Sequence, residues 1–219
     1  MKLSKNTVEV LKNFSQINPN ILVKAGQEIR TINSGKSAFA KATLTESFDK
    51  EFAIYDLNEL LAVLSLGDEP EVSLNDDHMA ISVQNFGEIN FFYSKPELVT
   101  APPEKDLPSS EGFFTHALTN DSLQFWLRTA ATISAPFVSI IADGTDAKVR
   151  ITDPELSNAT MFETVIGQTD KTFKAHIPTQ NIKMMPKDYT VNIPSTGGFV
   201  HFKSDNVEYW IALDKSSEF

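Results

Sequence analysis

Six basic side chains lie on or beside segments with helical patterning, and the chemistry open to them is the binding of phosphate groups. They are Lys2, Lys5, Lys12, Arg128, Lys183 and Lys187. Lys5, Glu9 and Lys12 stand at positions i, i+4 and i+7, which places all three on one face of a helix. Such a pattern is most simply a solvated polar face. The sharper interpretation is a cationic surface shared by several helices, which predicts contact with nucleic acid.

The other side chains that could do chemistry do not assemble into a site. The four histidines are scattered without metal-ligand spacing. Gly35-Lys36-Ser37 resembles the end of a phosphate-binding loop, but Arg30 stands where that motif requires its first glycine. Asp143-Gly144-Thr145-Asp146 lacks the ligand spacing and the terminal glutamate of a calcium loop. We therefore expect no catalytic residue, no metal site and no cofactor.

The charge balance of the 219-residue chain is acidic, with a formal net charge of −10 and a sequence pI of about 4.8. An acidic total disfavours nucleic-acid binding, but residues 1–17 hold three lysines and one acid. A basic stripe on an acidic protein could hold DNA there and repel it elsewhere. The chain has no cysteine, no apolar run that could cross a membrane and no secretory signal behind Met1. These features predict a reducing cytoplasm and no membrane partner.

Local sequence signals in the first half predict two helices that would position basic side chains. Ser4 is placed to cap a helix over 4–17, in which apolar residues recur every three positions. Asp56 can cap a second helix over 57–66. Strand-like runs occupy most of the remainder of this half.

The second half repeats this plan. Thr119 or Asn120 can cap a helix that runs to about Ser134. A short helix is predicted over 178–185, because Pro178 would occupy a first-turn position. Strands outweigh helices in both halves, so we predict an α+β fold in which two helices per half cover one face of the sheets.

The two halves are joined by 94–112, a segment with four prolines that predicts an ordered crossing. We predict an N-terminal domain over 1–93, a connecting loop over 94–112 and a C-terminal domain over 113–219. A shift of 116 positions places Lys12 on Arg128, which indicates a duplicated β/α module. A duplicated module without a catalytic constellation indicates an architectural protein.

Short blocks along nearly the whole chain carry a resemblance to a known family. They are Met1-Lys2-Leu3-Ser4-Lys5, Leu11-Lys12-Asn13-Phe14, Ile17-Asn18, Ala53-Ile54-Tyr55-Asp56-Leu57-Asn58, Leu64-Ser65-Leu66, Met184 with Pro186 and Tyr189, Tyr209, Ile211-Ala212-Leu213 and Phe219. In this order and at this spacing they are similar to the DNA polymerase sliding clamps (processivity factors) of T-even-type bacteriophages. The segments 68–118 and 140–172 diverge.

That resemblance implies a DNA clamp fold of two similar domains, each with two helices packed on antiparallel sheets. Three copies would close into a homotrimeric ring, with duplex DNA in the central hole and the six basic side chains facing it. The ring would be non-catalytic and would tether the replicative phage DNA polymerase in the cytoplasm of the infected bacterial host. An ATP-dependent clamp loader would open and close it, and late-transcription factors would be further partners.

The resemblance also implies a pocket between the domains for the C-terminal peptide of the polymerase. Its residues would be Val99, Leu107, Trp210, Ala212 and Leu213. From the residue pattern alone, 209–213 is more simply a core strand. Ring closure would pair the edge strands of neighbouring copies, 86–93 of one with 160–167 of the next.

Two other classes stay open from the residues themselves. A β-rich phage structural or assembly protein would form large polymers or particles rather than a small closed oligomer. A small hydrolase with an unrecognised site would turn over generic ester or phosphate substrates.

Overall fold

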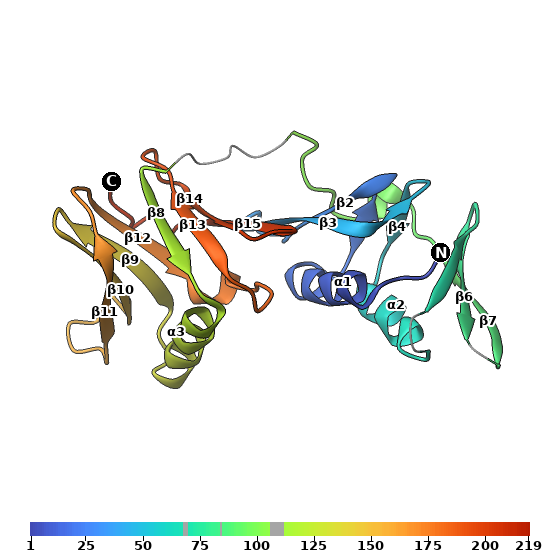
Figure 1. Ribbon diagram of the computed structural model, residues 1–219, viewed down its shortest axis with the longest axis horizontal. Coiled ribbons are helices and arrows are strands. Elements are labelled where there is room, and N and C mark those ends of the chain that lie inside the picture. Colours follow the sequence, from blue (N-terminus) through green and yellow to red (C-terminus); the bar gives the residue numbers. More distant parts are fainter. Residues whose placement is uncertain (68–69, 84, 106–111) are drawn as a thin grey trace. The chain divides into compact units, whose positions relative to one another are not determined.

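The computed structural model describes residues 1–67, 70–83, 85–105 and 112–219. The chain divides into two units, Met1–Lys105 and Asp106–Phe219. The division falls inside the segment 94–112, where the sequence places the connecting loop. Each unit combines α-helix with antiparallel strands (Figure 1).

The first unit contains helices α1 and α2, strands β1 to β7 and one short 3-10 helix. In chain order these are α1 (Lys5–Ile17), β1 (Ile21–Val23), β2 (Gly26–Ile32), β3 (Ala38–Phe48), β4 (Phe52–Ile54), α2 (Leu57–Leu64), β5 (Glu71–Leu74), β6 (His78–Val83), β7 (Gly87–Phe92) and η1 (Pro96–Leu98). Strand pairing within the unit is antiparallel. β1 pairs with β4, β2 pairs with β3, and β5, β6 and β7 follow one another in a meander.

The core of the first unit forms where α1 meets α2 and β3 (Figure 1). The amphipathic pattern of α1 buries Val10 and Phe14 completely, and Leu57 and Leu60 of α2 are buried with them. Burying a side chain of this size contributes about 1.5–3 kcal/mol of transfer free energy. The opposite side of α1 is consequently left to face solvent.

The second unit contains helix α3, strands β8 to β15 and a second 3-10 helix. In chain order these are β8 (Phe114–Leu118), α3 (Asn120–Thr132), β9 (Phe137–Asp143), β10 (Asp146–Thr152), β11 (Phe162–Gln168), β12 (Thr172–Pro178), η2 (Thr179–Asn181), β13 (Tyr189–Ile193), β14 (Phe199–Lys203) and β15 (Val207–Ala212). The strands pair antiparallel in the orders β11–β10–β9–β12 and β15–β14–β13–β8.

The core of the second unit lies between α3 and the sheet that contains β9 and β10. Trp126 and Ala130 of α3 are buried, as are Val138 on β9 and Val149 on β10. Alternate residues of β9 and β10 therefore point toward the helix, as the two-residue repeat of a strand requires.

The fourth predicted helix is wrong. Residues 178–185 form only η2, a single 3-10 turn. Pro178 at its N-cap makes no side-chain hydrogen bond, whereas Asp56 caps α2 by accepting the backbone N–H groups of the two residues that follow Leu57, at 2.9 and 3.3 Å. Pro186 also disfavours helical backbone at the residue before it. The described part of the chain thus has three α-helices, two in the first unit and one in the second, and the α+β class stands.

Candidate nucleic-acid interface

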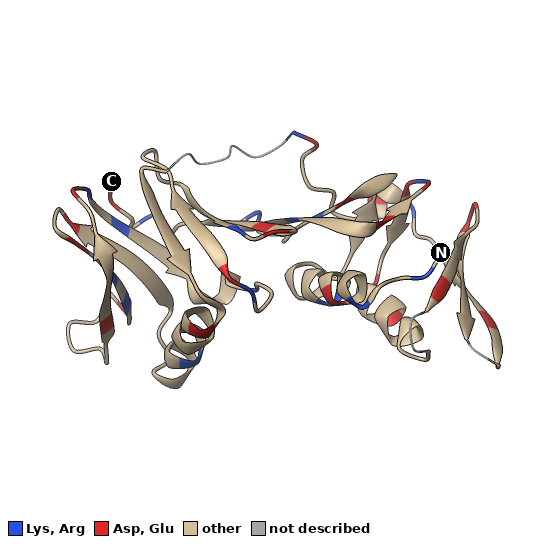
Figure 2. Ribbon diagram, in the orientation of Figure 1, with Lys and Arg blue, Asp and Glu red and all other residues tan. Residues whose placement is uncertain are grey.

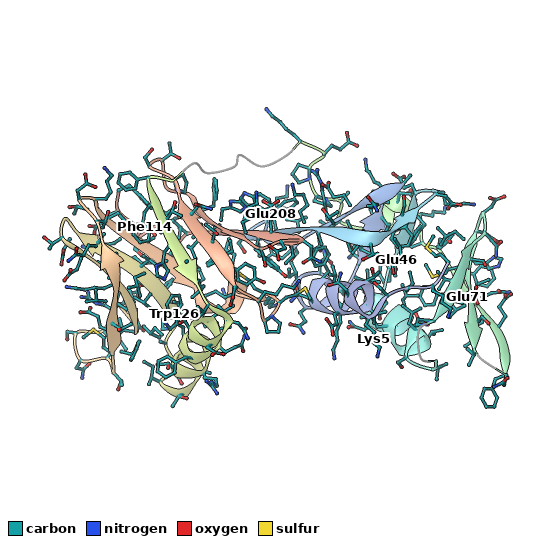
Figure 3. The ribbon with its side chains drawn as sticks, viewed as in Figure 1. Lys5, Glu46, Glu71, Phe114, Trp126 and Glu208 are labelled. Carbon is teal, nitrogen blue, oxygen red and sulfur yellow. The ribbon has the colours of Figure 1, made fainter. Side chains whose placement is uncertain are left out.

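The start of α1 is fixed by two side chains. The Ser4 hydroxyl accepts the backbone N–H of Thr7 at 3.2 Å, so Ser4 is the N-cap that its position predicted. Glu46 of β3, which is labelled in Figure 3, accepts hydrogen bonds from the Ser4 backbone N–H and from the Thr7 hydroxyl. Partial burial alone would raise the pKa of Glu46, but these hydrogen bonds outweigh it and hold the pKa below its ordinary value of 4.5. Glu46 therefore anchors the helix that carries Lys5.

The solvent-facing side of α1 is one continuous stripe. Its exposed residues are Lys5, Glu9, Lys12 and Gln16. They recur at helical spacing, while Thr7, Val10 and Phe14 on the other side are buried. Two cations and one carboxylate give the stripe a net charge of +1. Figure 2 shows basic residues on α1, in a chain whose total charge is −10.

Helix α3 repeats the arrangement of α1 in its own unit. Its exposed residues along the equivalent stripe are Asp121, Phe125, Arg128 and Thr132. Each stands 116 positions after its counterpart on α1, and the buried pair Trp126 and Ala130 matches Val10 and Phe14 at the same shift. The repeat predicted for this helix pair is confirmed, and Arg128 is the equivalent of Lys12.

The two stripes differ in charge. Asp121 stands in α3 where α1 has Lys5, and Phe125 stands where α1 has Glu9. Phe125 is 44% exposed and meets Phe162 of β11 edge to face, with 5.3 Å between ring centroids. The described residues of α2 include no lysine or arginine. Positive charge on the helices is therefore concentrated on α1.

Three of the six predicted DNA-facing cations lie outside the helices. Lys2 precedes α1 and forms a β-bridge with Glu71 of β5. Lys183 is exposed in the segment after η2. Lys187 is half-buried, and its ammonium donates to the Asn206 side-chain oxygen at 2.6 Å. These three are not part of the stripes on α1 and α3, and their DNA-facing role stays a prediction.

Of the two docking residues predicted in the connecting loop, the structure describes only Val99, which belongs to the first unit. Val99 is half-buried at the end of η1, where its backbone N–H donates to the Pro96 carbonyl at 3.3 Å. Leu107 lies outside the described residues.

The other three predicted docking residues lie in or directly after β15. Trp210 is only 5% exposed and stacks on His201, with ring centroids 4.4 Å apart and planes at 14°. Ala212 and Leu213 are half-buried, and the Leu213 backbone N–H donates to the Gly198 carbonyl at 3.0 Å. Ala212 and Leu213 are therefore the residues that a partner could contact here, whereas the Trp210 side chain packs against His201 inside the unit.

Two sets of contacts that hold parts of the candidate site in place were not predicted from the sequence. One is the Glu46 anchor of α1, and the other joins Arg30 and Lys24 to the connecting segment near Glu104. Each links residues that are far apart along the chain, so no local pattern indicates it.

Edge strands in each unit expose apolar side chains. β7 lies at the edge of the β5–β6–β7 sheet, with Phe92 66% exposed and Phe86, just before the strand, 89% exposed. β11 lies at the edge of the sheet that holds β10, with Val165 55% exposed. Unpaired apolar edges are surfaces on which another chain can add a strand.

Among the residues that the structure describes, no three His, Asp or Glu side chains are grouped so that they could hold a metal ion. No helix there combines the length and the apolar character needed to cross a membrane.

Both the sequence and the fold are similar to those of known proteins. Residues 2–93 match the family described as DNA polymerase processivity factor. The sliding clamp of Vibrio phage KVP40 is 31% identical over 98% of this chain and 99% of its own length. The chain belongs to the phage sliding-clamp family. The sliding clamp of Enterobacteria phage T4 is 29% identical over 99% of this chain and 98% of its own.

Structural comparison agrees with this family. PCNA from Thermococcus kodakaraensis superposes with a TM-score of 0.71 at 11% identity, covering 96% of each chain, which shows a shared fold. The predicted DNA clamp fold and the resemblance to clamps of T-even-type phages are thereby confirmed. The alternative of a phage structural protein is not favoured. In this sliding clamp, the repeated stripes of α1 and α3 are the candidate DNA-facing surface.

Proposed function

We propose that this clamp is the processivity factor of a phage replicative DNA polymerase, and that it works as a closed ring of three copies around duplex DNA. The observation that carries the proposal is the pair of equivalent stripes, with Lys12 and Arg128 in matching positions on an otherwise acidic chain. A repeated helix with an outward cation suits a ring in which every module presents the same kind of surface to one axial ligand.

The modest positive charge suits a protein that must slide. Every neutralised phosphate adds a salt-dependent increment to affinity, so many close contacts would hold the ring at one place on the duplex. The α1 stripe carries a net charge of only +1, because Glu9 stands between its two lysines. The ring stays on DNA because it encloses the duplex, and a few weak contacts to phosphates keep the duplex centred in the hole.

Ring closure is proposed to use the exposed edges. β7 of one copy would pair with β11 of the next, which would cover Phe92 and Val165 and satisfy the free backbone groups of both strands. We expect an ATP-dependent clamp loader to open one such joint.

The C-terminal peptide of the polymerase is proposed to contact Val99, Ala212 and Leu213, which the free chain leaves half-buried. Trp210, which is 5% exposed, would stabilise the strand that carries Ala212 rather than touch the peptide. The loader and late-transcription factors would use the same kind of surface in the cytoplasm of the infected host. We expect no catalysis by the clamp itself.

Light scattering over a concentration series tests the ring. The proposal predicts a mass near three times the chain mass of 24.3 kDa that falls on dilution. A monomer at every concentration, together with no stimulation of the polymerase on DNA, would overturn it.

A further inference from the structure

The described part of the connecting segment has few backbone donors with which to form hydrogen bonds of its own. Pro102 and Pro103 lack backbone N–H groups, so they cannot donate to a strand ladder or to a turn. Their carbonyl groups remain strong acceptors, which side chains or water can satisfy. Side chains from the body of the first unit can therefore fix the conformation of residues 101–105.

Arg30 of β2 supplies those donors. Its Nη1 donates to the carbonyl oxygens of Pro103, at 3.3 Å, and of Glu104, at 3.0 Å. Its Nε donates to the Glu28 carboxylate at 2.5 Å, which orients the guanidinium group. The Arg30 side chain is 19% exposed, although the two carbonyl groups belong to exposed residues. Because these acceptors are neutral, salt screens the Arg30 contacts less than it screens an ion pair.

Two further contacts reach the same segment but differ in kind. Lys24 forms an ion pair with Glu104 at 2.5 Å, but both side chains are more than half exposed. Their hydrogen bond raises the pKa of Lys24 and lowers that of Glu104. Solvent and salt weaken such an exposed pair. The Thr100 backbone N–H donates to the Asn20 side chain at 2.8 Å and fixes the start of the segment.

A small cavity separates the segment from the strands beneath it. Its volume is about 220 Å³, and Leu22 and Ala25 border it opposite Ala101 and Pro102. Arg30 also lines this cavity, so its hydrogen bonds join β2 to the segment there.

We propose that Arg30 is a positioning residue for partner docking, which holds residues 101–105 in the conformation that receives the partner peptide. The inference rests on the proposed function, because it takes the connecting segment to be one wall of the peptide-binding surface. Its physical basis is preorganisation. A peptide that meets an ordered segment does not have to offset the entropy of ordering it.

Amide hydrogen exchange in the free clamp tests the first step. Arg30→Ala should speed the exchange of the Val99 and Thr100 amides by about tenfold, because their hydrogen bonds to the Pro96 carbonyl and the Asn20 side chain lie at the start of the segment that Arg30 holds. Gln27→Ala, on the same strand but bonded to the Thr45 carbonyl, is the matched control and should leave these amides unchanged. Unchanged exchange in Arg30→Ala would overturn the proposal.

Titration with a synthetic peptide of the polymerase C-terminus tests the second step. Arg30→Ala should weaken peptide binding by about three- to tenfold while the molar mass of the ring is unchanged, and Arg30→Lys should recover part of the affinity. The Lys24→Ala effect should vanish at high salt, whereas the Arg30→Ala effect should persist. Faster exchange with unchanged peptide affinity would overturn the positioning role. If wild-type clamp does not bind the peptide, the docking proposal itself fails, while the exchange result still reports on the Arg30 contacts.

Discussion

At the scale of single residues, the α1 stripe sets how strongly the clamp holds DNA. Lys5 and Lys12 are exposed on the same helix face, and Glu9 between them offsets half of their charge. The carboxylate of Glu46 fixes this face by anchoring the first turn of α1. The electrostatic and the positioning roles can therefore be separated by mutation.

Replacing both Lys5 and Lys12 by alanine should shorten the product made per polymerase binding event. The salt slope of clamp–DNA association should fall by about 1 for each lysine that contacts a phosphate. Processivity measured across a salt series checks this. The charge-matched control is Lys171→Ala with Lys215→Ala, which removes two cations that lie outside the α-helices. Equal losses in the two double variants would contradict a DNA-facing role for α1.

Glu46→Gln should lower the free energy of unfolding by about 1 kcal/mol at neutral pH, because it weakens the hydrogen bonds to the first turn of α1. The folded chain lowers the pKa of Glu46. Its contribution is therefore complete above the unfolded value of 4.5 and is lost as pH falls through the lower folded value.

Urea unfolding of wild type and Glu46→Gln at neutral and at acidic pH checks this. The two stabilities should converge in acid. Glu51→Gln, which changes an exposed carboxylate, serves as the control. If the difference in unfolding free energy between wild type and Glu46→Gln stays constant across the pH range, the Glu46 carboxylate does not anchor α1.

At the scale of elements, the sequence predicted those helices whose ends and buried faces are set by local interactions. The caps Ser4, Asp56 and Thr119 and the apolar spacing of α1 and α3 were sufficient to place three helices. The helix over 178–185 was predicted from Pro178 at a first-turn position, but the segment has no capping side chain and Pro186 follows it.

The contacts of Glu46 and Arg30 could not be predicted, since they join elements that only the fold brings together. Strand β15, which holds two of the predicted docking residues, shows the same limit of prediction from sequence. The family resemblance placed Trp210 at a partner surface, whereas the residue pattern alone indicated a core strand. The structure shows that its ring stacks on His201 and is almost wholly buried. Burial depends on β14 and β15 pairing in one particular register.

Trp210→Ala should therefore lower the free energy of unfolding by about 3–5 kcal/mol, the cost of removing a large buried aromatic side chain. Leu213→Ala, at a half-buried position, should cost less stability and more peptide affinity. Urea unfolding and peptide titration on both variants compare the two effects. A Trp210→Ala clamp that is as stable as wild type but fails to bind the peptide would show that Trp210 acts at the surface after all.

At the scale of the whole molecule, the clamp combines a total charge of −10 with a weakly basic stripe on α1, an equivalent stripe on α3 without net charge, and two exposed strand edges. None of these features holds DNA tightly by itself. Together they fit a protein that stays on DNA because its copies close around the duplex. The central claim is therefore topological.

The direct measurement is the retention of loaded clamp on nicked circular DNA before and after a single restriction cut. The clamp loader and ATP would place the protein on the circle, and gel filtration would follow it at moderate salt. Enclosure predicts that clamp stays with the circle and is released when the cut gives it free ends to slide from. Clamp that remains bound to linear DNA, or that leaves the intact circle as quickly, would contradict an encircling ring.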